Sequence, residues 1–137
     1  MKSVLAVVAG FVFTVVVTLT LDVVMYQIGM FSKNAITVTT CAWLIAVAYR
    51  FAVGTAGSWI TAKFAPRRPL FHALIGGAIG TALGLIGLVM ALLKGPEMGP
   101  LWYAFAVLAS ILPASWIGGS LVKEEAASAA QSPAKQG

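Results

Sequence analysis

The stretch AVAYRFAVG, residues 46–54, places one permanent cation, Arg50, in the middle of an apolar run. If Arg50 marked a loop, the apolar segments on its two sides would both fall short of the ~20 residues that a helix needs to cross the hydrocarbon core. We therefore expect Arg50 to lie inside a membrane-spanning helix at about residues 41–61.

The whole chain has the composition of a membrane protein. Of its 137 residues, 60% are hydrophobic and 9% are charged, and its mean hydropathy is +0.95. A very apolar soluble bundle would need polar faces at helical period, and long stretches here have none. The fold class predicted is all-α, an integral membrane bundle of four transmembrane helices, with spans at about residues 4–25, 41–61, 70–93 and 101–121 in a domain of residues 1–121. The small, polar tail, residues 122–137, is expected to be disordered or to form an extended last turn.

The distribution of Lys and Arg predicts the orientation of these helices. With the N-terminus inside, one face holds six basic residues and the other holds Lys33 and Lys94. This bias predicts a multi-pass membrane protein with both termini cytoplasmic. It also explains the net charge of +5 without a nucleic-acid partner. The six inner residues are Lys2, Lys63, Arg67, Arg68, Lys123 and Lys135. Of these, Lys63, Arg67 and Arg68 are expected to anchor the topology or, alternatively, to bind a lipid headgroup.

Arg50 requires a partner, because a charged side chain near mid-span costs about 2.5–3.5 kcal/mol. Asp22 is the only acidic residue within the predicted spans. Side chains lean toward the N-terminus of their own helix, so Asp22 on an outbound helix and Arg50 on an inbound one lean toward each other. We therefore predict an intramembrane ion pair between Asp22 and Arg50. Four further residues are candidates for a polar network around it, or for bonds to their own backbones: Thr18, Tyr26, Tyr49 and Ser58.

Small residues recur every four positions and predict close helix packing. Asp22 and Arg50 each lie in a row of small or polar residues spaced four apart. In the third span this row contains Gly76, Gly80 and Gly84. In the fourth span, Pro113 removes a helical hydrogen bond, and Ser110 is expected to satisfy the freed carbonyl.

Several motifs together resemble a group of small, uncharacterised bacterial four-helix membrane proteins. They are LDVVMYQIG, YR, AKFAPRRPLFHA, GPLWY and LPASWIGG, which fall within residues 20–121. Tyr26, Ser32 and Lys63 depart from the pattern, where the group tends to have His, Pro and Arg. The resemblance implies the four-helix topology and a location in a bacterial inner (plasma) membrane, but no activity. It also implies these signature positions: Asp22, Tyr49, Arg50, Arg67, Pro69, His72, Trp102, Tyr103, Pro113 and Trp116.

The sequence contains no constellation typical of an enzyme, a cofactor site or a metal site. His72 is expected to hydrogen-bond rather than bind metal, and Cys41, the one cysteine, has no partner for an internal disulfide. Two functions stay open. The first is a structural or partner-binding role, with the lipid bilayer and with a second copy or another membrane protein as partner. The second is a small proton- or ion-coupled transporter or channel, with Asp22 as the titrating group and Arg50 as its counter-charge.

Overall fold

The structure, a computed structural model, describes residues 1–33 and 38–130. It contains four long α-helices, α1 (Lys2–Gln27), α2 (Thr40–Phe64), α3 (Pro69–Lys94) and α4 (Leu101–Ala130), and a short 3₁₀ helix, η2 (Gly95–Met98). Each of the four is long and apolar enough to cross a membrane. The predicted all-α bundle with four membrane-spanning helices is confirmed.

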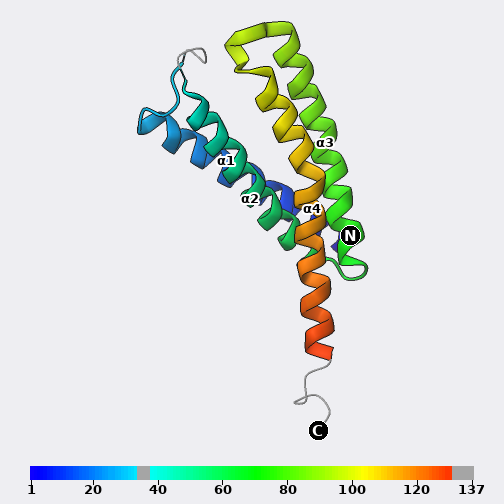
Figure 1. The fold of residues 1–137 in the computed structure, drawn as a ribbon. Coiled ribbons are helices and arrows are strands. Elements are labelled where there is room, and N and C mark those ends of the chain that lie inside the picture. Colours follow the sequence, from blue (N-terminus) through cyan, green and yellow to red (C-terminus); the bar gives the residue numbers. More distant parts are fainter. Residues whose placement is uncertain (34–37, 131–137) are drawn as a thin grey trace.

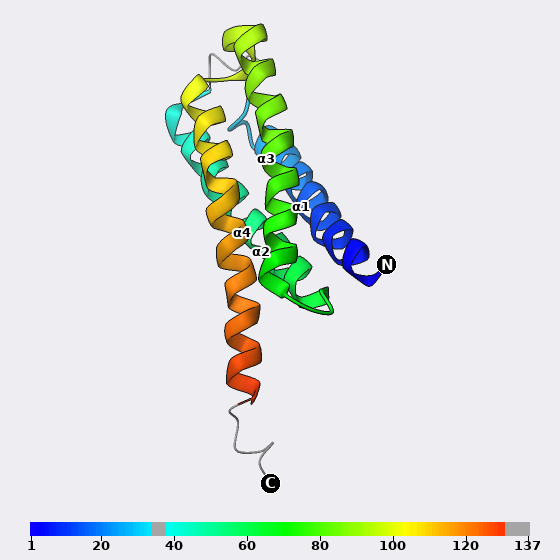
Figure 2. The same cartoon turned by 90° about the vertical axis from the view of Figure 1, so that its right-hand side faces the viewer.

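The four long helices form two pairs (Figure 1). Helices α3 and α4 make an elongated hairpin, and α1 and α2 lie together at an angle to it (Figure 1). Helix α4 packs against both α2 and α3, whereas α1 packs mainly against α2 and meets α3 over a small area. In the perpendicular view, the N-terminal half of α1 points away from α4 (Figure 2). Helices α2 and α4 therefore hold the bundle together.

Local sequence signals set the ends of the helices. The Thr39 hydroxyl accepts a hydrogen bond from the Ala42 N–H at 3.4 Å and caps α2. Pro69 stands at the start of α3, where its missing N–H removes no helical bond. Gly95 ends α3 at a φ of 71°, and Gly99 precedes α4 at a φ of 100°, both in the region that favours glycine.

Small residues form the core. A Cβ on Gly10 would collide with the Thr61 hydroxyl and with the Gly57 carbonyl oxygen, so α1 and α2 cross with their backbones almost in contact. Likewise, a Cβ on Gly118 would meet the α2 backbone at Thr55. Large apolar side chains point outward instead, as expected for a lipid-facing surface. In α1 the exposed ones are Val4, Leu5, Val8, Phe11, Val12, Val15, Val16, Leu19, Val23 and Val24.

The glycines of α3 differ from the prediction at one position. A Cβ on Gly84 would lie 2.9 Å from Leu108, and one on Gly80 would lie 3.3 Å from Ile111, so both face α4 closely. A Cβ on Gly76 would meet nothing within 4 Å, whereas one on Gly77 would lie 2.8 Å from the Ser115 Cβ. Neighbouring residues are ~100° apart around a helix, so the face that packs on α4 passes through Gly77 and not Gly76.

Helix α4 also differs from the prediction in its length. It continues past residue 121 to Ala130, because the segment KEEAASAA consists mainly of good helix formers. The rest of the predicted tail, residues 131–137 with Lys135, lies outside the described residues. The helix also continues through Pro113. The Ser110 hydroxyl donates to the Val107 carbonyl at 2.7 Å, so the partner predicted for Ser110 is wrong.

Candidate functional site

The structure brings Asp22 of α1 and Arg50 of α2 together. The Arg50 Nη2 atom donates to the Asp22 Oδ2 atom at 2.8 Å. Both side chains are half-buried, with 30% of Arg50 and 23% of Asp22 exposed. The long arginine side chain spans the gap between the two helices.

Tyr49 provides a second partner for the same carboxylate. Its hydroxyl donates to the Asp22 Oδ1 atom, so each carboxylate oxygen has one donor. Because Tyr49 and Arg50 are consecutive, one turn of α2 supplies both donors to α1. A carboxylate held by a hydroxyl and a guanidinium is a charge-assisted arrangement, stronger than a neutral hydrogen bond.

A fourth residue, Tyr103 of α4, joins this group. Its side chain lies near the Arg50 guanidinium, within range of an electrostatic interaction. Sequence reasoning missed this role, because a tyrosine next to Trp102 at the start of a span is typical of an interfacial aromatic belt. The polar cluster, defined as Asp22, Tyr49, Arg50 and Tyr103, therefore joins three helices.

One donor of this cluster has no partner. The Arg50 Nε atom is buried and makes no hydrogen bond with any residue of the described chain. The Arg50 Cζ atom lies 5.9 Å from the centroid of the Tyr49 ring. Arg50 thus keeps hydrogen-bonding capacity beyond the ion pair.

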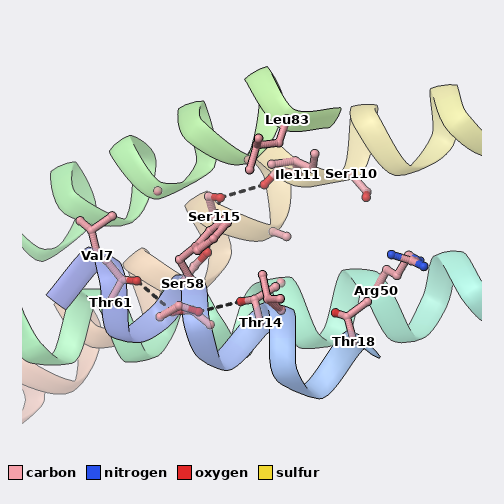
Figure 3. A pocket seen from close by; sticks show the side chains of 18 of the residues that line it. Val7, Thr14, Thr18, Arg50, Ser58, Thr61, Leu83, Ser110, Ile111 and Ser115 are labelled. Atoms are coloured by element: carbon pink, nitrogen blue, oxygen red, sulfur yellow. Dashed lines mark hydrogen bonds between the residues drawn. The ribbon is translucent and has the colours of Figure 1, made fainter. Parts of the chain in front are cut away.

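Among the described residues, the other predicted network residues form no hydrogen bond with Asp22. Tyr26 is exposed, and its ring packs against Phe31 with 5.8 Å between centroids. The Ser58 hydroxyl donates to Ser115 at 3.4 Å, in a separate contact between α2 and α4. Thr18 lies near Arg50, where both line the same cavity (Figure 3).

This central cavity has a volume of about 260 Å³ and takes its walls from all four long helices. Figure 3 shows α1 and α3 on opposite sides of it, with Arg50 and Thr18 toward one end and Val7 and Thr61 toward the other. Its lining combines one cation, six hydroxyls and small or apolar side chains. These residues are Val7, Gly10, Phe11, Thr14, Val15, Thr18, Arg50, Gly54, Gly57, Ser58, Thr61, Gly76, Gly80, Leu83, Val107, Ser110, Ile111, Ala114 and Ser115.

Most of the hydroxyls in the central cavity donate a hydrogen bond to a backbone carbonyl of their own helix. Thr14 donates to the Gly10 carbonyl at 2.8 Å and Thr61 to the Gly57 carbonyl at 3.1 Å. Ser115 behaves in the same way. Their oxygen lone pairs remain available as acceptors, while Arg50 is a donor. The cavity therefore offers hydrogen-bond acceptors and one donor to water or to a small polar solute.

The predicted anchor residues lie at the opposite end of α2 from Cys41. The Lys63 Nζ atom lies 4.3 Å from the centroid of the Trp59 ring, a cation–π contact. Arg67 and Arg68 are exposed in the turn between α2 and α3. The His72 Nδ1 atom lies 3.1 Å from the Arg68 carbonyl oxygen, a local bond in the first turn of α3.

Comparisons with protein-family models, with curated proteins and with solved structures find no match to this chain. The resemblance to the bacterial four-helix group stays a prediction from the motifs.

Proposed function

We propose that this protein has a structural or partner-binding role in a membrane, and that the Asp22–Arg50 pair fixes the register of α1 on α2. The observation that carries the proposal is the satisfied state of the Asp22 carboxylate, which accepts from both Tyr49 and Arg50. A carboxylate held in this way is suited to joining helices. The location in a bacterial inner membrane belongs to the same proposal and is supported by the resemblance of the motifs. The cytoplasmic position of both termini is supported by the distribution of Lys and Arg.

The energy of the pair follows from the membrane environment. Hydrogen bonds between side chains of neighbouring transmembrane helices contribute about 0.6 kcal/mol on average. Removing Asp22 alone would cost more, because Arg50 would keep its charge without its carboxylate, and an unpaired charge in the bilayer costs about 2.5–3.5 kcal/mol. The pair therefore disfavours alternative registers more strongly than it stabilises the correct one.

The accumulation of charge variants in a membrane tests this role. We expect Asp22→Ala and Arg50→Ala each to lower the amount of folded protein several-fold, and the exchange variant Asp22→Arg with Arg50→Asp to recover part of it. Glu97→Ala and Lys94→Ala, which remove charges near the loop between α3 and α4, serve as matched controls and should accumulate normally. Independent losses at Asp22 and Arg50 without recovery in the exchange variant would overturn the proposal.

A second function, small-solute or ion transport, is favoured by one specific observation. Arg50 both pairs with Asp22 and lines the central cavity, and its buried Nε atom has no partner in the described chain. In this alternative the cavity binds the solute, Asp22 takes up and releases a proton, and Arg50 supplies the counter-charge.

Flux measurements in proteoliposomes discriminate the two functions. Transport predicts a flux driven by a pH gradient that Asp22→Asn abolishes at equal reconstitution, while Glu97→Gln leaves it unchanged. If no flux is found across a broad panel of cations and drugs, the transport alternative is wrong.

A further inference from the structure

A shallow groove lies at the end of the bundle where α2 passes into α3. It has a volume of about 430 Å³ and is distinct from the central cavity. One side comes from the start of α3 and the other from α4. Its lining residues are Arg68, Pro69, Leu70, Phe71, Leu74 and Lys123.

Two cations from separate parts of the sequence meet at this groove. Arg68 precedes α3 in a left-handed backbone conformation, with a φ of 51°. Lys123 comes from the part of α4 that extends beyond the predicted span. Both are exposed. In the described part of the chain, neither forms an ion pair within 4.0 Å, although Glu124 directly follows Lys123. The two positive charges are therefore free to bind an anion.

The rest of the groove is apolar. Leu70, Phe71 and Leu74 lie on the first two turns of α3, and 56% of Phe71 is exposed. An inorganic anion would gain no binding energy from this apolar wall. A molecule with an anionic head and an alkyl chain would match both parts, because the chain would cover apolar surface that is otherwise left bare.

We propose that this groove binds an anionic phospholipid. Its phosphate would lie between Arg68 and Lys123, and an acyl chain would follow Leu70, Phe71 and Leu74. This end of the bundle would lie at the level of the lipid headgroups, because the apolar part of α2 ends near Lys63 and that of α3 begins after Pro69. The site does not depend on the role of the polar cluster.

Two other basic residues at this end of the bundle are not part of the site. Lys63 lies over the Trp59 ring, and Arg67 does not line the groove. The predicted anchor set therefore divides: Arg68 joins Lys123 at the groove, while Lys63 and Arg67 add only to the general positive charge. This division provides a matched control, since two pairs of residues at the same end carry the same total charge.

Lipid titration of the purified full-length protein, followed by native mass spectrometry, tests the proposal. We compare dioleoyl phosphatidylglycerol with dioleoyl phosphatidylcholine, using wild type, the groove variant R68A/K123A and the control variant K63A/R67A. Wild type should retain phosphatidylglycerol preferentially. The groove variant should lose roughly tenfold or more in affinity, because each basic residue near a membrane contributes about 1 kcal/mol to binding anionic lipid. The control variant should stay within about threefold of wild type.

Two further measurements complete the experiment. Thermal unfolding checks that each variant is folded, and R68Q/K123Q replaces the alanine variant if that one is not. Equal losses in the groove and control variants would overturn the proposal, because general charge would then explain binding. Inorganic phosphate that competes as strongly as the lipid would also overturn it, because the acyl chain would then contribute nothing.

Discussion

Gly10 of α1 and Gly57 of α2 face each other so closely that neither position has room for a Cβ. Their carbonyls also accept the hydroxyls of Thr14 and Thr61, which lie on the same two faces. Close approach of backbones is the main source of attraction between helices in lipid, where the hydrophobic effect between helices is absent. This crossing and the polar cluster hold α1, which has little contact with α3.

Gly10→Ala should therefore destabilise the protein, and Gly76→Ala should not. The new Cβ at Gly10 meets the α2 backbone, and overpacking of this kind costs about 1–3 kcal/mol. At Gly76 a Cβ meets nothing within 4 Å, and alanine is the better helix former. Thermal unfolding in detergent micelles should show a lower Tm for Gly10→Ala alone. Equal losses in both variants would mean that the two glycines do not differ in packing.

Tyr49→Phe should lower stability by about 1 kcal/mol, because it removes the hydroxyl that donates to Asp22 and keeps the ring. Tyr26→Phe is the matched control, since the Tyr26 ring is exposed and packs only against Phe31 among its ring contacts in the described chain. Chemical unfolding of both variants measures the difference. A Tyr49→Phe variant as stable as Tyr26→Phe would show that the hydrogen bond to Asp22 contributes nothing.

Trp43→Ala should cost about 1–3 kcal/mol, because the indole packs on two rings and on a glycine. Its centroid lies 4.6 Å from that of Tyr103 and 5.4 Å from that of Phe31, and it covers Gly99 at the entry to α4. Trp116→Ala, which removes a tryptophan that is 58% exposed, should cost less. The difference in Tm between the two variants measures this contact, and a larger loss at Trp116 would contradict it.

Cysteine labelling in whole cells checks the predicted orientation. In a Cys41→Ser background, Glu97→Cys in η2 should react with a membrane-impermeant maleimide added outside. Glu124→Cys near the other end of the bundle should react only after the cells are permeabilised. Both positions are exposed, so lack of reaction reflects the membrane rather than burial. The reverse pattern would show that the termini lie outside.

The sequence was sufficient to predict the number and position of the helices, because apolar segments of spanning length have few alternatives in lipid. The pairing of Asp22 with Arg50 was also predictable, since Arg50 needs a partner and a single acidic residue lies within the spans. Tyr49 was among the candidates for a polar network around this pair. These predictions depend on the cost of an isolated charge, which the sequence alone reveals.

Other features depend on how the helices rotate about their axes, which the sequence does not define. A stripe with a spacing of four drifts by ~40° at each step, so in α2 the contact with α1 passes from Arg50 to Gly57 and Thr61. Meanwhile Gly54 and Ser58, which follow Arg50 by four and eight residues, face α4. The same drift carries the contact of α3 with α4 from Gly84 and Gly80 to Gly77 instead of Gly76. Tyr103 could not be assigned to the polar cluster, because its position also suits the membrane interface.

A double-mutant cycle between Asp22→Asn and Arg50→Gln, read as the free energy of unfolding in detergent micelles, tests the central claim most directly. If the two side chains form the link between α1 and α2, the double variant should be less destabilised than the sum of the single variants, with a coupling energy of about 1–2 kcal/mol. Effects that add to within about 0.3–0.5 kcal/mol would contradict the account, because they would show that Asp22 and Arg50 act independently.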